Sequence, residues 1–125
     1  MIDTPSGQIP VEDLRQGMLI WALNDAGERV EATIVKTAVT SVSPDFLMVK
    51  ITLSDGRTVT ASPGHPTADN KPLGDYLVGD ILDGAVVSTV GKVPDQNGVT
   101  YDILPSGGTG LYWGNGILLK STLTE

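Results

Sequence analysis

Two segments of the chain are spelled alike, and this repeat limits the folds that the sequence can adopt. Residues 10–17 and 72–79 share proline, an apolar residue, aspartate and glycine at the same four positions. A proline-led turn ending in glycine is common, so chance is the alternative, but four matched features at one offset favour internal duplication. Proline suits the first turn of a helix and glycine can end it, so each copy predicts a single helical turn. We therefore expect a domain made of two related halves.

Strand signals dominate the rest of the sequence. Val, Ile and Thr are concentrated in short runs, and Asp55-Gly56 between two such runs is a strong hairpin signal. Residues 93–98 and 105–110 are expected to be loops, and no linker divides the chain. We expect one all-β domain over residues 1–125, with strands at 18–23, 30–42, 46–53, 58–61, 85–90, 100–104, 111–113 and 117–119.

Composition excludes several partners. Eight Lys and Arg against fifteen Asp and Glu give a formal net charge of −7. An acidic surface repels phosphate backbones, which argues against nucleic acid, and it offers no polybasic patch to an anionic membrane. Without cysteine, these residues form no disulfide, thiolate metal site or thiol nucleophile. We expect no metal, no cofactor and a monomeric state.

The lone histidine is the best candidate for chemistry. His65 lies between Gly64 and Pro66 directly after an expected strand, and Ser62 precedes it by three residues. A bend over this segment could bring the serine hydroxyl near the imidazole. The pair could then activate the serine as a nucleophile, or bind and polarise a peptide bond supplied from elsewhere.

Two other uses of His65 have weak support. Neither a Gly-x-Ser-x-Gly elbow nor a following helix accompanies Ser62, so a hydrolase triad is poorly supported. Asp69 and Asp75 lack metal-ligand spacing, and a second histidine is missing. The structural alternative is a loop histidine bonded to backbone. Four aromatic residues are expected in the core or at its rim, because such side chains bury a large area, namely Trp21, Trp113, Tyr101 and Tyr112.

Taken in order along the chain, these motifs resemble the Hint superfamily, which includes hedgehog autoprocessing domains, inteins and bacterial intein-like domains. The resemblance covers nearly the whole chain, although each motif alone is weak. It rests on the turn at 4–7, the segment 10–17, the hairpin at 54–57, Ser62-x-x-His65, Tyr101-Asp102 and the Asn115-Gly116 pair with its apolar continuation.

The resemblance implies a horseshoe-like all-β fold with two pseudo-twofold related halves, and self-processing chemistry. In the family, a Cys or Ser at the start of the domain attacks the preceding carbonyl. By resemblance, His65 would protonate the departing amide nitrogen and Ser62, at the usual Thr position, would hold the peptide. Asp102 falls at the Tyr-Asp position, where an aspartate can assist cleavage.

Several family residues are replaced or lie outside the sequence. The nucleophile is expected several residues before Thr4, upstream of Met1. Gly110 stands where a second histidine is usual. Lys120 and Ser121 stand where splicing inteins have His-Asn, and serine has no side-chain amide to cyclise.

These departures leave two hypotheses. The first is a degenerate self-processing domain that does not splice and at most cleaves at its N-terminal side, with an upstream Cys or Ser. Its partner would be the flanking polypeptide of its own precursor. The second is an inactive structural or interaction module within a larger surface, secreted or phage protein.

Overall fold

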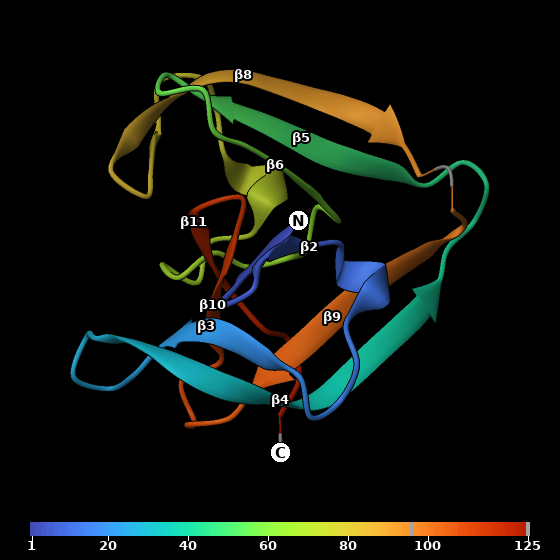
Figure 1. Ribbon diagram of the computed structural model, residues 1–125. Coiled ribbons are helices and arrows are strands. Elements are labelled where there is room, and N and C mark those ends of the chain that lie inside the picture. Colours follow the sequence, from blue (N-terminus) through green and yellow to red (C-terminus); the bar gives the residue numbers. More distant parts are fainter. Residues whose placement is uncertain (96, 125) are drawn as a thin grey trace.

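The computed structural model describes residues 1–95 and 97–124 and confirms an all-β fold (Figure 1). Two short 3₁₀ turns interrupt the strands, and no helix in these residues is long and apolar enough to cross a bilayer. The elements are β1 (Ile2–Thr4), β2 (Gly7–Ile9), η1 (Val11–Asp13), β3 (Leu19–Leu23), β4 (Arg29–Ser41), β5 (Leu47–Leu53), β6 (Thr58–Ala61), η2 (Leu73–Asp75), β7 (Ile81–Leu82), β8 (Ala85–Pro94), β9 (Val99–Pro105), β10 (Leu111–Gly114) and β11 (Ile117–Lys120).

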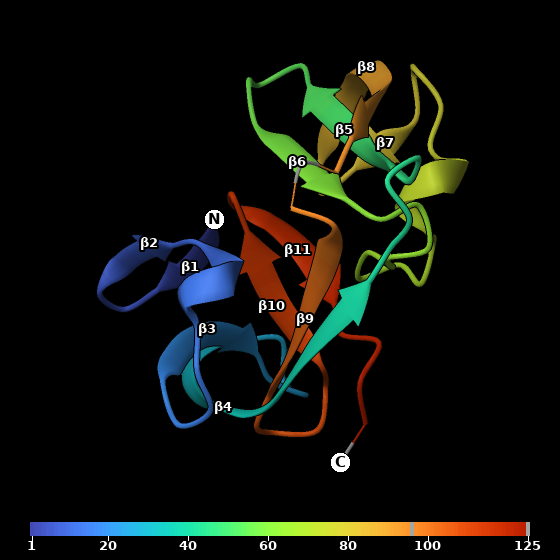
Figure 2. The same cartoon turned by 90° about the vertical axis from the view of Figure 1, so that its right-hand side faces the viewer.

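The strands form two antiparallel sheets that face each other as layers (Figure 2). The larger sheet has the order β2-β1-β10-β3-β4-β9, with β11 paired to β10. The smaller sheet has the order β6-β5-β8-β7. Each sheet therefore combines strands from both halves of the sequence, which is the expected horseshoe with two related halves.

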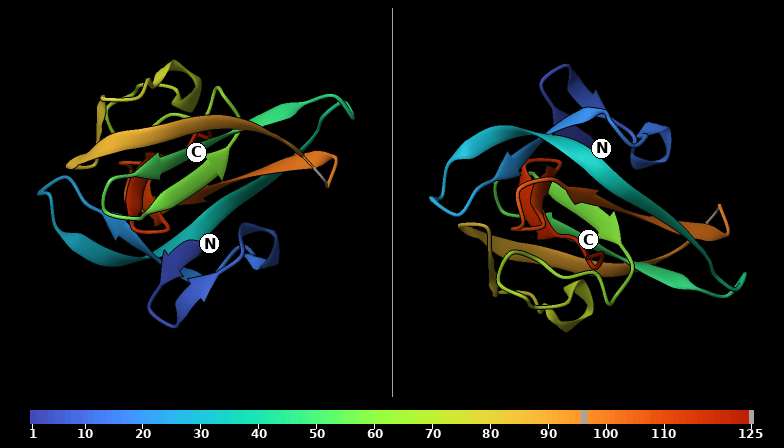
Figure 3. Two further views of the ribbon diagram at one scale, coloured as in Figure 1. Left: turned by 90° about the horizontal axis from the view of Figure 1, so that it is seen from above. Right: turned by 90° about the horizontal axis from the view of Figure 1, so that it is seen from below.

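Two short connections join the layers at one end of the horseshoe (Figures 1 and 3). The chain passes from β4 to β5 and later returns from β8 to β9. The two crossings lie side by side, because the Val42 N–H donates to Gly98 O at 3.0 Å and the Asp95 N–H donates to Phe46 O at 3.2 Å. Since β4 pairs with β9 and β5 with β8, the two halves exchange strands and cannot separate without breaking both sheets.

The two copies of the repeat adopt the same local structure. In each copy the N–H of the aspartate donates to the carbonyl of the leading proline, from Asp13 to Pro10 and from Asp75 to Pro72, both at 3.0 Å. The predicted helical turns are therefore confirmed as one 3₁₀ turn each, at η1 and η2.

The glycines that end the two copies have the same backbone conformation and make equivalent hydrogen bonds. Gly17 and Gly79 have φ values of +93° and +96°, a region that L side chains rarely occupy. Each donates its N–H at 2.9 Å to a strand of its own half, Gly17 to Ile34 O and Gly79 to Val87 O. The repeat thus anchors a turn to the hairpin that follows it, β3–β4 in one half and β7–β8 in the other.

Strand lengths differ from expectation in the second half. β8 runs to Pro94, whereas residues 93–98 were expected to form a loop. Its last residues pair with β5, Val93 with Met48 and Pro94 with Leu47, so a partner strand sustains a segment whose own composition favours a turn. β7, only two residues long, was not expected at all.

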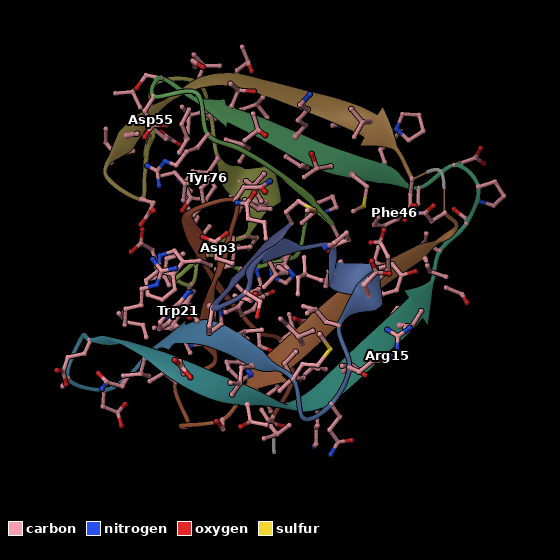
Figure 4. All side chains as sticks on the ribbon, in the orientation of Figure 1. Asp3, Arg15, Trp21, Phe46, Asp55 and Tyr76 are labelled. Carbon is pink, nitrogen blue, oxygen red and sulfur yellow. The ribbon has the colours of Figure 1, made fainter. Side chains whose placement is uncertain are left out.

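The core lies between the layers and draws on nearly every element. Tyr76 is 2% exposed, and its hydroxyl lies 2.8 Å from the Thr67 hydroxyl. Figure 4 shows Tyr76 on the inner side of the smaller layer, facing the larger one, and Trp21 on the larger layer. Trp21 and Trp113 are half-buried rim residues that hold the Arg29 guanidinium between them, at 4.8 and 5.1 Å from the ring centroids.

The repeat glycines provide a test of the duplication. We predict that Gly17→Ala and Gly79→Ala each lower the free energy of unfolding by about 1–2 kcal/mol, because a Cβ at positive φ is strained even where space is open. Gly91→Ala is the matched control, since Gly91 lies within β8 with open space and no positive φ. Urea denaturation should show two similar losses and none for Gly91→Ala; a neutral effect at either repeat glycine would contradict equal roles.

Candidate active site

His65 lies in the turn between β6 and η2, and backbone hydrogen bonds fix it there. Its N–H donates to Ser62 O at 3.0 Å, and its carbonyl accepts the Leu73 N–H at 3.0 Å. The side chain is only 7% exposed. The second copy of the repeat therefore holds the histidine backbone from one side.

A close approach at Gly74 completes this support. The Gly74 N–H donates to Pro63 O at 2.8 Å, and a Cβ on Gly74 would lie 3.0 Å from Pro63 Cβ. The matching position of the first copy is Glu12, one residue before Asp13 as Gly74 is one before Asp75. The second copy thus carries a glycine where the histidine turn needs contact with the backbone.

The imidazole contacts a tyrosine hydroxyl rather than backbone. His65 Nε2 lies 3.0 Å from the Tyr112 hydroxyl, and the two rings meet edge-on at an interplanar angle of 79°. Tyr112 belongs to β10 and is 3% exposed. Its hydroxyl also donates to Asp102 Oδ1 over a long 3.4 Å, so one oxygen links the histidine to a carboxylate.

Asp102 is a buried carboxylate on β9 whose oxygens are all bonded. Oδ1 accepts the Ile103 N–H at 2.8 Å in addition to the Tyr112 hydroxyl. Oδ2 accepts the Thr122 N–H at 2.8 Å and the Thr122 hydroxyl. Such full bonding offsets the cost of burying a charge. It also ties the segment after β11 to the centre of the fold.

The environment keeps His65 and Tyr112 uncharged. Burial lowers the pKa of His65 below its ordinary 6.5, and the nearby negative charge of Asp102 opposes this only in part. Burial also raises the pKa of Tyr112 well above 10.0, with the charge of Asp102 and the hydrogen bond to it acting in the same direction. A neutral imidazole near neutral pH can accept a proton from a reacting group.

His65 lies in the wall between two cavities. The first, of about 250 Å³, is also lined by Met1 and Ile2, and the second, of about 200 Å³, is lined by Asp102 and Thr122. Four residues line both cavities, namely Ser62, His65, Thr100 and Tyr101. The first and last described parts of the chain therefore meet the histidine from opposite sides.

The structure brings the predicted site residues together, although not through the expected contacts. Ser62 lines both cavities beside His65, but its hydroxyl forms no hydrogen bond within residues 1–95 and 97–124. Asp102 reaches His65 only through Tyr112. Their roles in catalysis stay a prediction. Over the same described ranges, no group of three or more His, Asp or Glu could hold a metal ion.

Two residues of this network were missed by sequence reasoning. Tyr112 was expected only as a core or rim aromatic, and Thr122 was not among the predicted site residues. A buried tyrosine hydroxyl needs a partner, which is a usable signal. The identity of that partner depends on the pairing of β10 with β3 and β11, which local sequence does not reveal.

Burial of His65 makes stability depend on pH in a defined window. Because its folded pKa lies below the unfolded value of 6.5, its contribution is complete above pH 6.5 and is lost as pH falls below it. We predict that the free energy of unfolding decreases as the pH is lowered from about 7.5 to about 5. The titratable groups nearest the ring are Tyr112 and, through it, Asp102. Glu12 and Asp95 line the first cavity with His65, and Tyr101 lines both cavities.

His65→Gln is the matched variant for this test, since glutamine keeps a polar side chain but does not titrate. Urea denaturation of the variant should show a clearly smaller change over the same pH range. An equal change in both proteins would contradict the assignment, as would a wild-type protein that becomes more stable towards about pH 5.

Comparison with known proteins places this arrangement in a known fold. No protein-family profile matches the sequence, and no curated protein matches it. Solved structures match over nearly the whole chain at low identity. The Ssp DnaB mini-intein variant M86 superposes with a TM-score of 0.81 at 18% identity, covering 99% of this chain and 91% of that one.

Two further structures agree. A DnaB intein from Synechocystis sp. PCC 6803 gives a TM-score of 0.78 at 19% identity, covering 98% of this chain and 94% of that one. A bacterial intein-like domain from Clostridium thermocellum gives 0.77 at 22% identity, with the same coverages of 98% and 94%. At these identities the likeness is one of fold. The chain is a Hint-fold domain, built like the inteins and the bacterial intein-like domains.

Proposed function

We propose that this chain is a self-processing domain within a longer polypeptide, and that it cleaves the peptide bond at its N-terminal side without splicing. The observation that carries the proposal is the place of His65. A buried, neutral histidine linked to a carboxylate lines the same cavity as Met1 and Ile2. Polypeptide that enters the domain through Met1 would reach this cavity.

Backbone hydrogen bonds hold the start of the chain against β10 and the turn that follows it. The Met1 carbonyl accepts the Asn115 N–H at 2.9 Å, and Ile2 pairs with Gly114 at the edge of β10. The Asn115 side chain donates to Thr58 O at 2.9 Å and so joins the β10–β11 turn to β6, the strand that leads to His65. The entering chain and the histidine are thus held by one set of strands.

The proposed reaction is an acyl shift. The thiol or hydroxyl of a Cys or Ser upstream of Met1 attacks the carbonyl carbon of the residue before it. A C–S or C–O bond forms, and the C–N bond to the nucleophile's own nitrogen breaks. His65 accepts the proton of the nucleophile and delivers it to the departing nitrogen, so protons balance and no cofactor takes part. Hydrolysis of the resulting (thio)ester releases the upstream polypeptide.

Ser62 and Asp102 have supporting roles in this proposal. The Ser62 hydroxyl, beside His65 in the walls of both cavities, would hold the peptide that reacts. Asp102 would supply negative charge that stabilises the protonated imidazole through Tyr112. Splicing is not proposed, because Ser121 lacks the side-chain amide that could cyclise and release a downstream partner.

A precursor assay tests the proposal. The chain is expressed with the polypeptide that its gene encodes upstream of Met1, including the nearest Cys or Ser, and is incubated with hydroxylamine or a thiol. We predict cleavage at that Cys or Ser, and a rate lower by about 10²–10⁴-fold in His65→Ala. The matched control, Tyr76→Phe, removes a buried hydroxyl outside the site and should cleave at the wild-type rate.

Mass spectrometry should locate the new terminus at the predicted Cys or Ser. Cleavage that is equally fast in wild type and His65→Ala would exclude the histidine from the reaction. An intact precursor after long incubation would contradict the proposed activity as a whole.

The second candidate is an inactive structural module. One observation favours it: Thr122 already occupies Asp102 Oδ2 with two hydrogen bonds, as a purely structural anchor would. Thr122→Val tests this candidate in the same precursor, because valine keeps the shape and removes the hydroxyl. If the chain is only a structural module, the precursor stays intact in both proteins and Thr122→Val lowers the free energy of unfolding. Cleavage of the wild-type precursor would reject this candidate.

A further inference from the structure

The Tyr112 hydroxyl lies between two groups that can each accept its single hydrogen. His65 Nε2 is 3.0 Å away and Asp102 Oδ1 is 3.4 Å away. A phenol has one hydrogen to donate and lone pairs to accept with. If Tyr112 donates to His65, Nε2 must accept and the imidazole proton lies on Nδ1. If Tyr112 donates to Asp102, Nε2 can carry the proton and donate it to the Tyr112 oxygen.

Charge decides between the two arrangements. Asp102 is buried and acts only as an acceptor toward Ile103 and Thr122, as a carboxylate does. Hydrogen bonds to a charged acceptor are stronger than those to a neutral one. If the hydroxyl pointed at His65 instead, a phenol lone pair would face the carboxylate oxygen in a buried setting, which is repulsive. Donation to Asp102 is therefore favoured, even across the longer distance.

We propose that Tyr112 is a positioning residue that donates its proton to Asp102, holds His65 in the tautomer protonated on Nε2, and leaves Nδ1 as the basic nitrogen of the site. The catalytic use of this arrangement rests on the proposed function. The tautomer itself does not.

The arrangement suits a histidine that first accepts a proton and then returns it. Nδ1 takes the proton of the nucleophile, and the imidazolium forms while its Nε2–H still donates to the Tyr112 oxygen. The positive charge is then stabilised by Asp102 through one intervening hydroxyl, without a direct ion pair. Two further acidic residues, Glu12 and Asp95, line the first cavity together with His65.

Nuclear magnetic resonance of the imidazole nitrogens tests the proposal on the chain as it stands. His65 is the only histidine, so its ring signals need no assignment by mutation. At neutral pH we expect wild type to show the Nε2–H tautomer. Tyr112→Phe should give a mixture with substantial Nδ1–H and a lower measured pKa of His65. The matched control, Tyr76→Phe, removes another buried tyrosine hydroxyl and should leave both observables unchanged.

Asp102→Asn keeps the test decisive if Tyr112→Phe does not fold. Asparagine removes the negative charge that favours donation from Tyr112 to residue 102, so the Tyr112 hydroxyl donates more often to Nε2 and the Nδ1–H tautomer grows. A wild-type Nδ1–H tautomer would overturn the proposal, as would a tautomer that neither Tyr112→Phe nor Asp102→Asn changes.

The same variants separate this proposal from the proposed function. In the precursor, Tyr112→Phe should cleave more slowly than wild type, but faster than His65→Ala, with a shifted pH profile. An Nε2–H tautomer in a chain that never cleaves would leave Tyr112 as a positioning residue and reject only the activity. Cleavage with an Nδ1–H tautomer would reject only the role of Tyr112.

Discussion

The hydrogen-bonded series His65–Tyr112–Asp102–Thr122 is the interaction on which the site depends. It joins the turn after β6, the strands β9 and β10 and the segment that follows β11, so residues far apart in sequence meet in one buried group. Buried polar groups are costly unless all of them are bonded. The series therefore fixes the relative positions of these elements around the histidine.

The duplication explains how the fold can support such a site. Equivalent proline-led turns anchor one hairpin in each half. The pairing of β4 with β9 and of β5 with β8 locks the halves together. The copies then diverge where chemistry requires it. Gly74 in the second copy lets the turn contact the backbone that carries His65, whereas Glu12 in the first copy lines the cavity instead. Scaffold and site thus share one repeated motif.

Much of this could be predicted from sequence, for physical reasons that differ by element. The strand runs, the Asp55-Gly56 hairpin and both helical turns follow from local backbone preferences, and the structure confirms them. The length of β8 could not be predicted, because pairing with β5 extends it beyond its own propensity. Tyr112 and Thr122 were not predicted as site residues for a similar reason: their partners are set by long-range strand pairing, and neither belongs to a local motif around His65.

The central claim is that His65 is a buried, neutral base coupled to Asp102 through Tyr112. The most direct measurement is a pH titration of the His65 ring by nuclear magnetic resonance, in wild type and in Asp102→Asn. We predict a pKa of His65 below the ordinary value of 6.5 in wild type, because burial outweighs the charge of Asp102. We predict a still lower pKa when that charge is removed. A wild-type pKa at or above 6.5, or a value unchanged in Asp102→Asn, would contradict the central claim.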